Sequence, residues 1–148
     1  MRTLFGRPFW HNPPTLISYT LDGGDSSKQV FDIYSFSHVT HGILLYGLCA
    51  WLRIPFTMGL YISLLIEVAW ELFENSEYII QKYRTSFPGY DGDSVVNIVG
   101  DIMFTVFGYV MTSYSPTVSI IYACVSEIVL MPFKANFLYL SIGHLLQK

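Results

Sequence analysis

IPFTMGLYISLLIEVAW, residues 54–70, is the stretch that decides the fold of this sequence. Glu67 is its only charged residue, and its 17 positions are about the shortest helix that can cross the hydrocarbon core of a bilayer. Three other segments have the same character: 36–52, 94–113 with only Asp101 charged, and 117–133 with only Glu127 charged. The sequence therefore predicts an all-α transmembrane bundle of about four spanning helices.

The composition agrees with a membrane location. The chain has 148 residues, of which 52% are hydrophobic and 13% are charged, too few charges to cover a soluble globule. A net charge of -3 with only 8 Lys and Arg leaves no basic surface for phosphates, so nucleic acid is not an expected partner. Cys49 and Cys124 lie inside apolar runs and imply no disulfide framework.

The chain is expected to consist of a polar N-terminal segment, residues 1–33, and a single transmembrane helical domain, residues 34–148. The N-terminal segment has no sustained apolar run and is predicted to be neither a signal peptide nor a span. The second helix is expected to continue as a more polar helix through residues 71–83. The tail from residue 134 repeats apolar residues at helical spacing but is too short to span, which favours an interfacial or re-entrant helix.

Positive charge predicts the orientation. Seven Lys and Arg residues flank one side of a four-span arrangement, whereas only Arg53 lies on the other side. Because positive loops stay in the cytoplasm, we expect both termini to be cytoplasmic, in a bacterial inner (plasma) membrane. The seven residues are Arg2, Arg7, Lys28, Lys82, Arg84, Lys134 and Lys148.

Ionisable residues within the predicted spans are concentrated in the cytoplasmic half. Each such group costs about 2.5–3.5 kcal/mol on insertion scales, so it needs a partner or a purpose. Helical spacing of i, i+4, i+7 or i+8 places them on one face of each helix, which predicts that three polar stripes turn toward a shared interior. The stripes are His38 with His41; Glu67 with Glu71 and Glu74; and Asp93 with Asn97 and Asp101.

Two imidazoles beside several carboxylates are a ligand set suited to Zn, Mn or Fe. The predicted ligands are His38, His41, Glu71, Asp93 and Asp101. Glu71 or Glu74 is also a candidate general base, and His41 a candidate proton shuttle. Glu67 is expected to bind a substrate, and Asn97 to orient either the substrate or a carboxylate. As an alternative, Asp93 acts only as the N-cap of the helix that follows it.

Several motifs carry a family resemblance. The strings DIYSFSHVTHG (32–42), EVAWELFENSEYIIQKYRT (67–85), YDGDSVVNIVGD (90–101) and SEIVLMPFKANFLYLSI (126–142) contain SHxxHG, WExxEN and GDSxxN followed by Asp. They resemble a family of small uncharacterised integral membrane proteins, a domain of unknown function typical of alphaproteobacteria. Members usually begin with an additional hydrophobic segment, so a span preceding this sequence is expected.

A looser resemblance links the chain to the VanZ-like membrane proteins. The activity of those proteins is also unsettled, and Arg84, like Asn97 and Glu67, is predicted here as a binding residue. The matching positions are His41, Glu71, Arg84, Asp93, Asn97 and Gly100.

Three functions remain open at this point. The first is a metal-binding or hydrolytic site for a lipid-like or amphiphilic substrate, although no standard catalytic signature is present and the sequence does not decide whether the protein is an enzyme. The second is a structural or assembly subunit whose polar core fixes helix packing. The third is an ion or proton pathway, for which the outer half offers only groups such as Thr57, Ser63, Thr105 and Tyr109.

Overall fold

The computed structural model describes residues 9–10, 16–18, 26–86 and 88–143. Expectations that concern Arg2, Arg7, Lys148 or most of residues 1–25 lie outside these residues. The described helices are α1 (Ser35–Trp51), α2 (Phe56–Glu74), α3 (Glu77–Ser86), α4 (Val95–Tyr114) and α5 (Pro116–Leu130), with the short helical segments η2 (Ser26–Lys28), η3 (Met131–Phe133) and η4 (Tyr139–Gly143).

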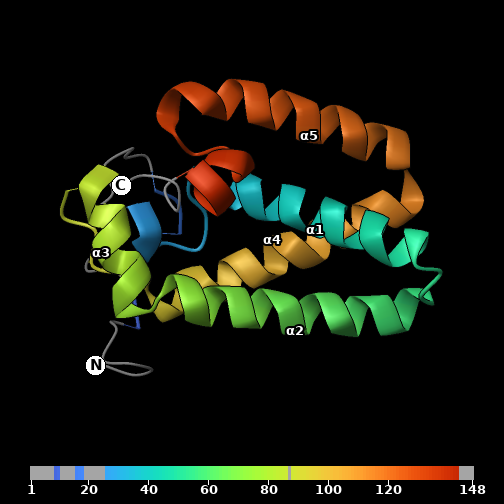
Figure 1. Ribbon diagram of the computed structural model, residues 1–148, viewed down its shortest axis with the longest axis horizontal. Coiled ribbons are helices and arrows are strands. Elements are labelled where there is room, and N and C mark those ends of the chain that lie inside the picture. The colour runs from blue at the N-terminus through green and yellow to red at the C-terminus, as the bar shows by residue number, and fades with distance from the viewer. Residues whose placement is uncertain (1–8, 11–15, 19–25, 87, 144–148) are drawn as a thin grey trace.

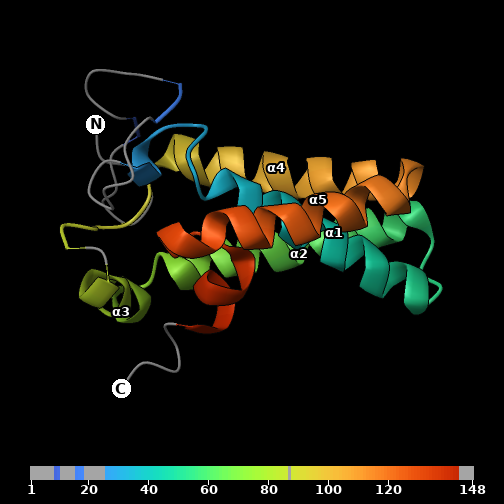
Figure 2. The same cartoon turned by 90° about the horizontal axis from the view of Figure 1, so that it is seen from above.

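Four long helices run side by side, with α1 and α4 between α2 and α5 (Figure 1). The turns between them begin where the sequence stops the helix: Pro55 precedes α2, and Pro116 occupies the first turn of α5. The shorter α3 and η2 lie together at one end of the bundle (Figures 1 and 2). We call this the polar end, because the charged stripes of the long helices reach it.

Helices α1 and α4 pack almost backbone to backbone, which glycine makes possible. A Cβ atom on Gly42 would lie 1.9 Å from the carbonyl oxygen of Thr105, and one on Gly108 would lie 2.1 Å from the carbonyl oxygen of Val39. The Thr105 hydroxyl donates to the carbonyl oxygen of His38 at 3.1 Å. Small residues at close crossings are typical of helices that associate in lipid.

The distribution of side chains is that of a membrane protein. Glu67 and Asp101 are 0% and 4% exposed, whereas Leu65 and Ile128 are 71% and 70% exposed. Within the described residues, three segments are long and apolar enough to cross a membrane: Phe56–Glu74, Val95–Tyr114 and Pro116–Phe133. The 17 residues of α1 rise only about 26 Å, so its crossing, and with it the count of about four spans, stays a prediction.

The prediction that the second helix runs on to residue 83 is wrong. α2 ends at Glu74, and a new helix begins at Glu77. The side chain of Asn75 turns back to donate to the carbonyl oxygen of Glu71 at 3.1 Å, and the Ser76 hydroxyl accepts from the backbone of Ile79 at 3.5 Å. Asparagine and serine compete for backbone groups in this way at helix ends.

The tail contains the short helical segment that an interfacial or re-entrant helix requires, and Glu127 draws it back against the bundle. The Glu127 carboxylate accepts hydrogen bonds from the side chain of Asn136 at 2.9 Å and from the backbone of Phe137 at 2.7 Å. Lys134, in the left-handed conformation, makes the turn. Within the described part of the tail, residues 137–143 are helical, and Tyr139–Gly143 forms the wider turn of this segment. Glu127 therefore has a structural partner away from the other buried carboxylates.

The contact between α1 and α4 generates a test of the fold. Gly42→Ala should reduce stability by about 1–3 kcal/mol, because its methyl group cannot fit unless the two helices separate. Gly47→Ala is the matched control in the same helix, since nothing lies within 4 Å of its Cβ position. This control should be neutral or up to about 1 kcal/mol more stable. Thermal unfolding in detergent, followed by circular dichroism, measures both; an equal loss in the two variants would contradict the packing argument.

Candidate functional site

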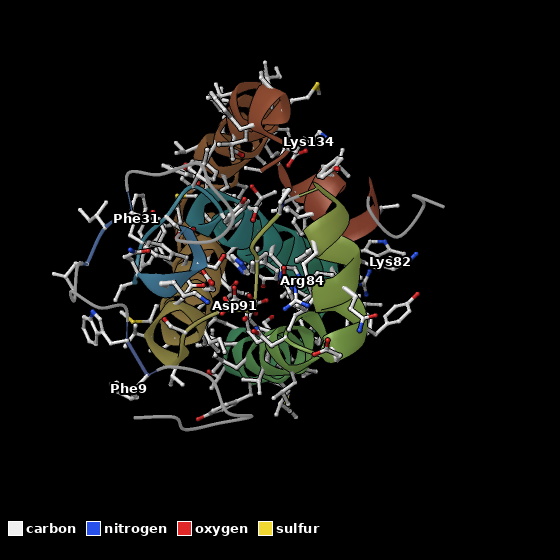
Figure 3. The ribbon with its side chains drawn as sticks, turned by 90° about the vertical axis from the view of Figure 1, so that its left-hand side faces the viewer. Phe9, Phe31, Lys82, Arg84, Asp91 and Lys134 are labelled. Atoms are coloured by element: carbon white, nitrogen blue, oxygen red, sulfur yellow. The ribbon has the colours of Figure 1, made fainter. Side chains whose placement is uncertain are left out.

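The polar stripes of α1, α2 and α4 meet inside the bundle at its polar end. Figure 3 looks onto this end, where Arg84 and Asp91 lie over the ends of the helices. His38 comes from the first turn of α1, Glu67 and Glu71 from successive turns of α2, and Asp101 from the second turn of α4. The stripes converge because each would otherwise face lipid.

His38, Glu67 and Glu71 form the tightest group. The Nδ1 atom of His38 is 2.8 Å from Oε1 of Glu67 and 3.7 Å from Oε1 of Glu71. One donor atom from each of the three lies within 4.8 Å of the others, close enough for all three to bind a single ion. We call these residues the His38 cluster. The sequence analysis had assigned Glu67 to substrate binding and not to the metal ligands.

Several carboxylate oxygens here are buried without a hydrogen-bond donor among the described residues. They are both oxygens of Glu71, Oε2 of Glu67 and Oδ1 of Asp101. An unsatisfied buried polar atom is costly, and a buried charge more so, unless an ion, a proton or a ligand satisfies it. The His38 cluster therefore has unused capacity to bind a cation.

His41 and Asp101 lie beside the cluster. The Nδ1 atom of His41 is in ion-pair contact with Oε2 of Glu67, at 2.5 Å. On the far side of His38, Nε2 is 3.8 Å from Oδ2 of Asp101. Histidine ligands of metals usually have a carboxylate near their second nitrogen, and Asp101 occupies that position.

A cavity of about 40 Å³ opens beside the cluster. His38, His41 and Asp101 line it from the bundle, and Glu74 lines it where α2 ends. On its apolar side the His41 ring is 5.6 Å from the ring of Phe137 and 6.2 Å from that of Trp70, measured between centroids. The tail that Glu127 holds in place thus supplies one wall of the cavity.

Two tyrosines outside the long helices complete the cavity wall. The Tyr83 hydroxyl donates to Glu74 at 2.6 Å, and the Tyr90 hydroxyl donates to Asp93 at 2.9 Å. Burial raises the pKa of both phenols above the usual range; the charge of Glu74 adds to the shift at Tyr83, and that of Asp93 to the shift at Tyr90. Both therefore remain hydrogen-bond donors at neutral pH.

Asp93 lies apart from the His38 cluster and is already bonded. Besides Tyr90, its carboxylate accepts from the side chain of Asn75 at 2.7 Å, while its backbone N–H donates to the Asn75 side-chain oxygen at 2.8 Å. The N-cap of α4 is not Asp93 but Ser94, whose hydroxyl accepts from the backbone of Asn97 at 3.2 Å. This network joins α2 to α4.

The two predicted binding residues outside the cluster contact backbone groups. The Nε atom of Arg84 donates to the carbonyl oxygen of Tyr90 at 2.7 Å. The side chain of Asn97 donates to the carbonyl oxygen of Gln29 at 2.8 Å, which anchors the chain before α1. The buried Lys28, which the sequence places only among the positive charges of the cytoplasmic side, donates to Asp91 and to the carbonyl oxygen of Gly92.

Asp32 is a buried carboxyl that the sequence analysis did not select, although it begins the first family motif. Its Oδ1 atom accepts from the backbone of Tyr34 at 2.8 Å and of Ser35 at 3.1 Å, so it organises the start of α1. Burial, and then the charge of Asp93, raise the pKa of Asp32 to about 7.

Comparison with known proteins finds an uncharacterised family. The family model described as "Protein of unknown function (DUF2585)" matches residues 4–147. A "UPF0314 protein" of Sphingopyxis alaskensis is 39% identical over 104 residues, which cover 68% of this chain and 52% of the relative. A "UPF0314 protein" of Novosphingobium aromaticivorans is 39% identical over 116 residues, 72% of this chain and 55% of the relative.

A third "UPF0314 protein", from Paracoccus denitrificans, is 43% identical over 97 residues, 62% of this chain and 50% of the relative. The matches thus cover about half the length of these curated relatives. No solved structure matches. The resemblance to an uncharacterised alphaproteobacterial family is confirmed, while the looser resemblance to VanZ-like proteins stays a prediction.

Asp32 generates a test of electrostatics at the polar end. Its pKa is about 7 in the fold against 3.8 as the ordinary value, so between these values the folded protein holds a proton that the unfolded chain has lost. This contribution to stability is present below about pH 4 and is lost as the pH rises to about 7. Asp32→Asn lacks this contribution. As the pH rises from about 4 to about 7, the free energy of unfolding of the variant should therefore increase relative to that of the wild type, by a few kcal/mol at most.

Thermal unfolding of both proteins in detergent at several pH values from 4 to 7 measures this shift. Groups distant from Asp32 affect the two proteins alike, so the difference between the curves reports Asp32 and the charged groups it interacts with, Asp93, His38 and Asp101. Parallel pH profiles would show that the Asp32 carboxyl is ionised in the fold across the whole range.

Proposed function

Because the chain belongs to the DUF2585 family, whose description assigns no activity, we propose a function from the site: a metal-dependent membrane hydrolase that acts on an amphiphilic substrate. The observation that carries the proposal is Glu71, which is 2% exposed and has no hydrogen-bond donor for either carboxylate oxygen among the described residues. A divalent cation beside His38 and Glu67 would satisfy it.

The donor set fits Zn, Mn or Fe. One imidazole nitrogen and two carboxylates are ligands that these ions accept, and a set of three leaves coordination positions for water and substrate. The position of Asp101 at the second nitrogen of His38 supports the same assignment. When bound, the cation would polarise a carbonyl or phosphoryl oxygen and acidify a water molecule.

The surrounding residues have roles that follow from their positions. Glu67 would bind the cation through Oε1 and hold His41 through Oε2. Because Nδ1 of His41 contacts Glu67, its Nε2 atom is left for the cavity that His41 lines. There His41 would accept a proton from the attacking water and return it to the leaving group. Glu74 and Asp101 face the same cavity and remain for substrate binding.

The substrate would be amphiphilic because one side of the cavity wall is aromatic and the other side is acidic. Trp70 and Phe137 supply aromatic surface at the side where α2 and the tail meet the bilayer region, whereas the carboxylates lie on the other side. We propose that this end of the bundle faces the cytoplasm, since the Lys and Arg residues near α3 and the tail lie there and only Arg53 lies at the opposite end.

A structural role is the second candidate, and the bonding of Asp93 favours it for part of the network. Asp93 and Asn75 are satisfied by each other and by Tyr90, so this pair can fix helix packing without chemistry. An ion pathway has less support: the buried hydroxyls of Thr105 and Tyr109 in the outer half donate to backbone carbonyls.

Metal analysis of detergent-purified protein tests the proposal. The wild type should hold about one Zn, Mn or Fe ion per chain, and removal by a chelator should lower the thermal unfolding midpoint, because a bound ion stabilises only the folded state. Glu71→Gln should weaken binding by at least about tenfold. Glu77→Gln, the same change at an α3 residue whose carboxylate pairs with Gln81, is the control and should bind normally.

Two results would contradict the proposal. One is a folded wild type that takes up no stoichiometric metal and whose midpoint does not respond to a chelator. The other is metal binding that Glu71→Gln and Glu77→Gln reduce equally, which would place the ion elsewhere.

A further inference from the structure

We propose that the cavity binds the ammonium group of a positively charged amphiphile, between Asp101 and Glu74. The inference rests on the proposed function and names its substrate class: a lipid-like molecule whose headgroup carries a primary amine. The argument uses the charge, the aromatic lining and the size of the cavity.

Asp101 supplies the first observation. It is 4% exposed, lines the cavity, and its Oδ1 atom has no hydrogen-bond donor among the described residues. A carboxylate in this position attracts a donor that carries positive charge, since charge-assisted hydrogen bonds are about twice as strong as neutral ones. An ammonium group in the cavity would supply three N–H donors.

Glu74 provides a second carboxylate on the same cavity. Its Oε1 atom accepts from Tyr83, which fixes the orientation of the carboxylate. Glu74 is half-buried at the end of α2, where a headgroup arriving from the membrane surface meets it. Asp93 also lines the cavity, but its bonds to Tyr90 and Asn75 occupy it.

Aromatic rings make up much of the remaining wall. Trp70, Tyr83, Tyr90 and Phe137 line the cavity, and the rings of Tyr83 and Tyr90 meet at 5.4 Å between centroids. The negative face of an aromatic ring attracts a cation, and this contribution grows when water is excluded. Rings and carboxylates together form a setting that favours ammonium over anionic groups.

The basic residues of this end are directed away from the cavity. Among the described residues that line it, none is Lys or Arg. The nearby Lys28 is bound to Asp91 and Gly92, and Arg84 is exposed and donates to Tyr90. An anionic headgroup would therefore meet no cationic side chain in the cavity.

Size selects among ammonium groups. A cavity of about 40 Å³ has room for the equivalent of a few water molecules, which suits a primary ammonium better than a trimethylammonium. The charge balance also permits it beside a metal ion. The two charges of Glu67 and Glu71 would balance a divalent ion, which leaves Glu74, Asp93 and Asp101 on the cavity beside it.

The experiment compares headgroups on one hydrocarbon chain. Purified protein in dodecyl maltoside at pH 7 is titrated with dodecylamine, dodecanol, dodecyl phosphate and dodecyltrimethylammonium. Binding is followed by the shift in thermal unfolding and by tryptophan fluorescence, to which Trp70 contributes. Dodecylamine should bind at least about tenfold more tightly than the other three, since a hydrogen bond to a charged group contributes about 1.5–3 kcal/mol.

Variants locate the binding. Glu74→Gln should weaken dodecylamine binding by about tenfold and leave metal content unchanged, whereas Glu77→Gln should change neither. Asp101→Asn should also weaken amine binding, and it provides the test if Glu74→Gln does not fold. If neither variant folds, the comparison of headgroups on the wild type decides.

Failure of this inference is distinguishable from failure of the proposed function. Glu71→Gln should lose the metal and still bind dodecylamine. A wild type that holds its metal but binds dodecanol or dodecyl phosphate as well as dodecylamine overturns the amine inference alone. Equal amine binding by wild type, Glu74→Gln and Asp101→Asn also overturns it, because the amine is then held by general attraction to an acidic protein.

Discussion

The close crossing of α1 and α4 is the constraint on which the rest of the structure depends. Gly42 and Gly108 let the two backbones touch, and this contact brings His38 of one helix to within 3.8 Å of Asp101 on the other. Wider separation would admit lipid or water between them and remove Asp101 from its contact with His38. The glycine contacts thus allow His38 and Asp101 to be buried together, although neither glycine takes part in their chemistry.

The sequence was sufficient to predict the three described helices that are long and apolar enough to cross a membrane, and the faces that turn inward. Apolar length identifies helices that cross a bilayer, and the i, i+4 spacing of Glu67 and Glu71 requires both to share a face. Since lipid rejects charge on every side, the inward direction follows without knowledge of any contact. The sequence could therefore predict that His38, Glu67 and Glu71 share a polar interior. It could not predict that these three residues form one cluster.

Other features depend on pairs of residues that are distant in sequence and have no periodic pattern. The side chain of Asn75, at the end of α2, binds Asp93, which lies 18 residues later in the sequence. Nothing in the spacing of the two residues indicates this pairing. Glu127 lies as deep as Glu67 by sequence, yet it binds the amides of the returning tail. Depth predicts that a carboxylate needs a partner, but only the fold determines whether the partner is a histidine or a backbone group.

The reciprocal bonds between Asn75 and Asp93 have a further consequence. They close a loop at its base: the 17 intervening residues, 76–92, leave the bundle after α2 and return at the start of α4 through two hydrogen bonds at 2.7 and 2.8 Å. Since the entropy of closing a loop changes only slowly with its length, this excursion can lengthen or shorten among relatives while α2 and α4 keep their register. The residues at the edge of the cavity can therefore change without a shift in the helices that hold its buried carboxylates.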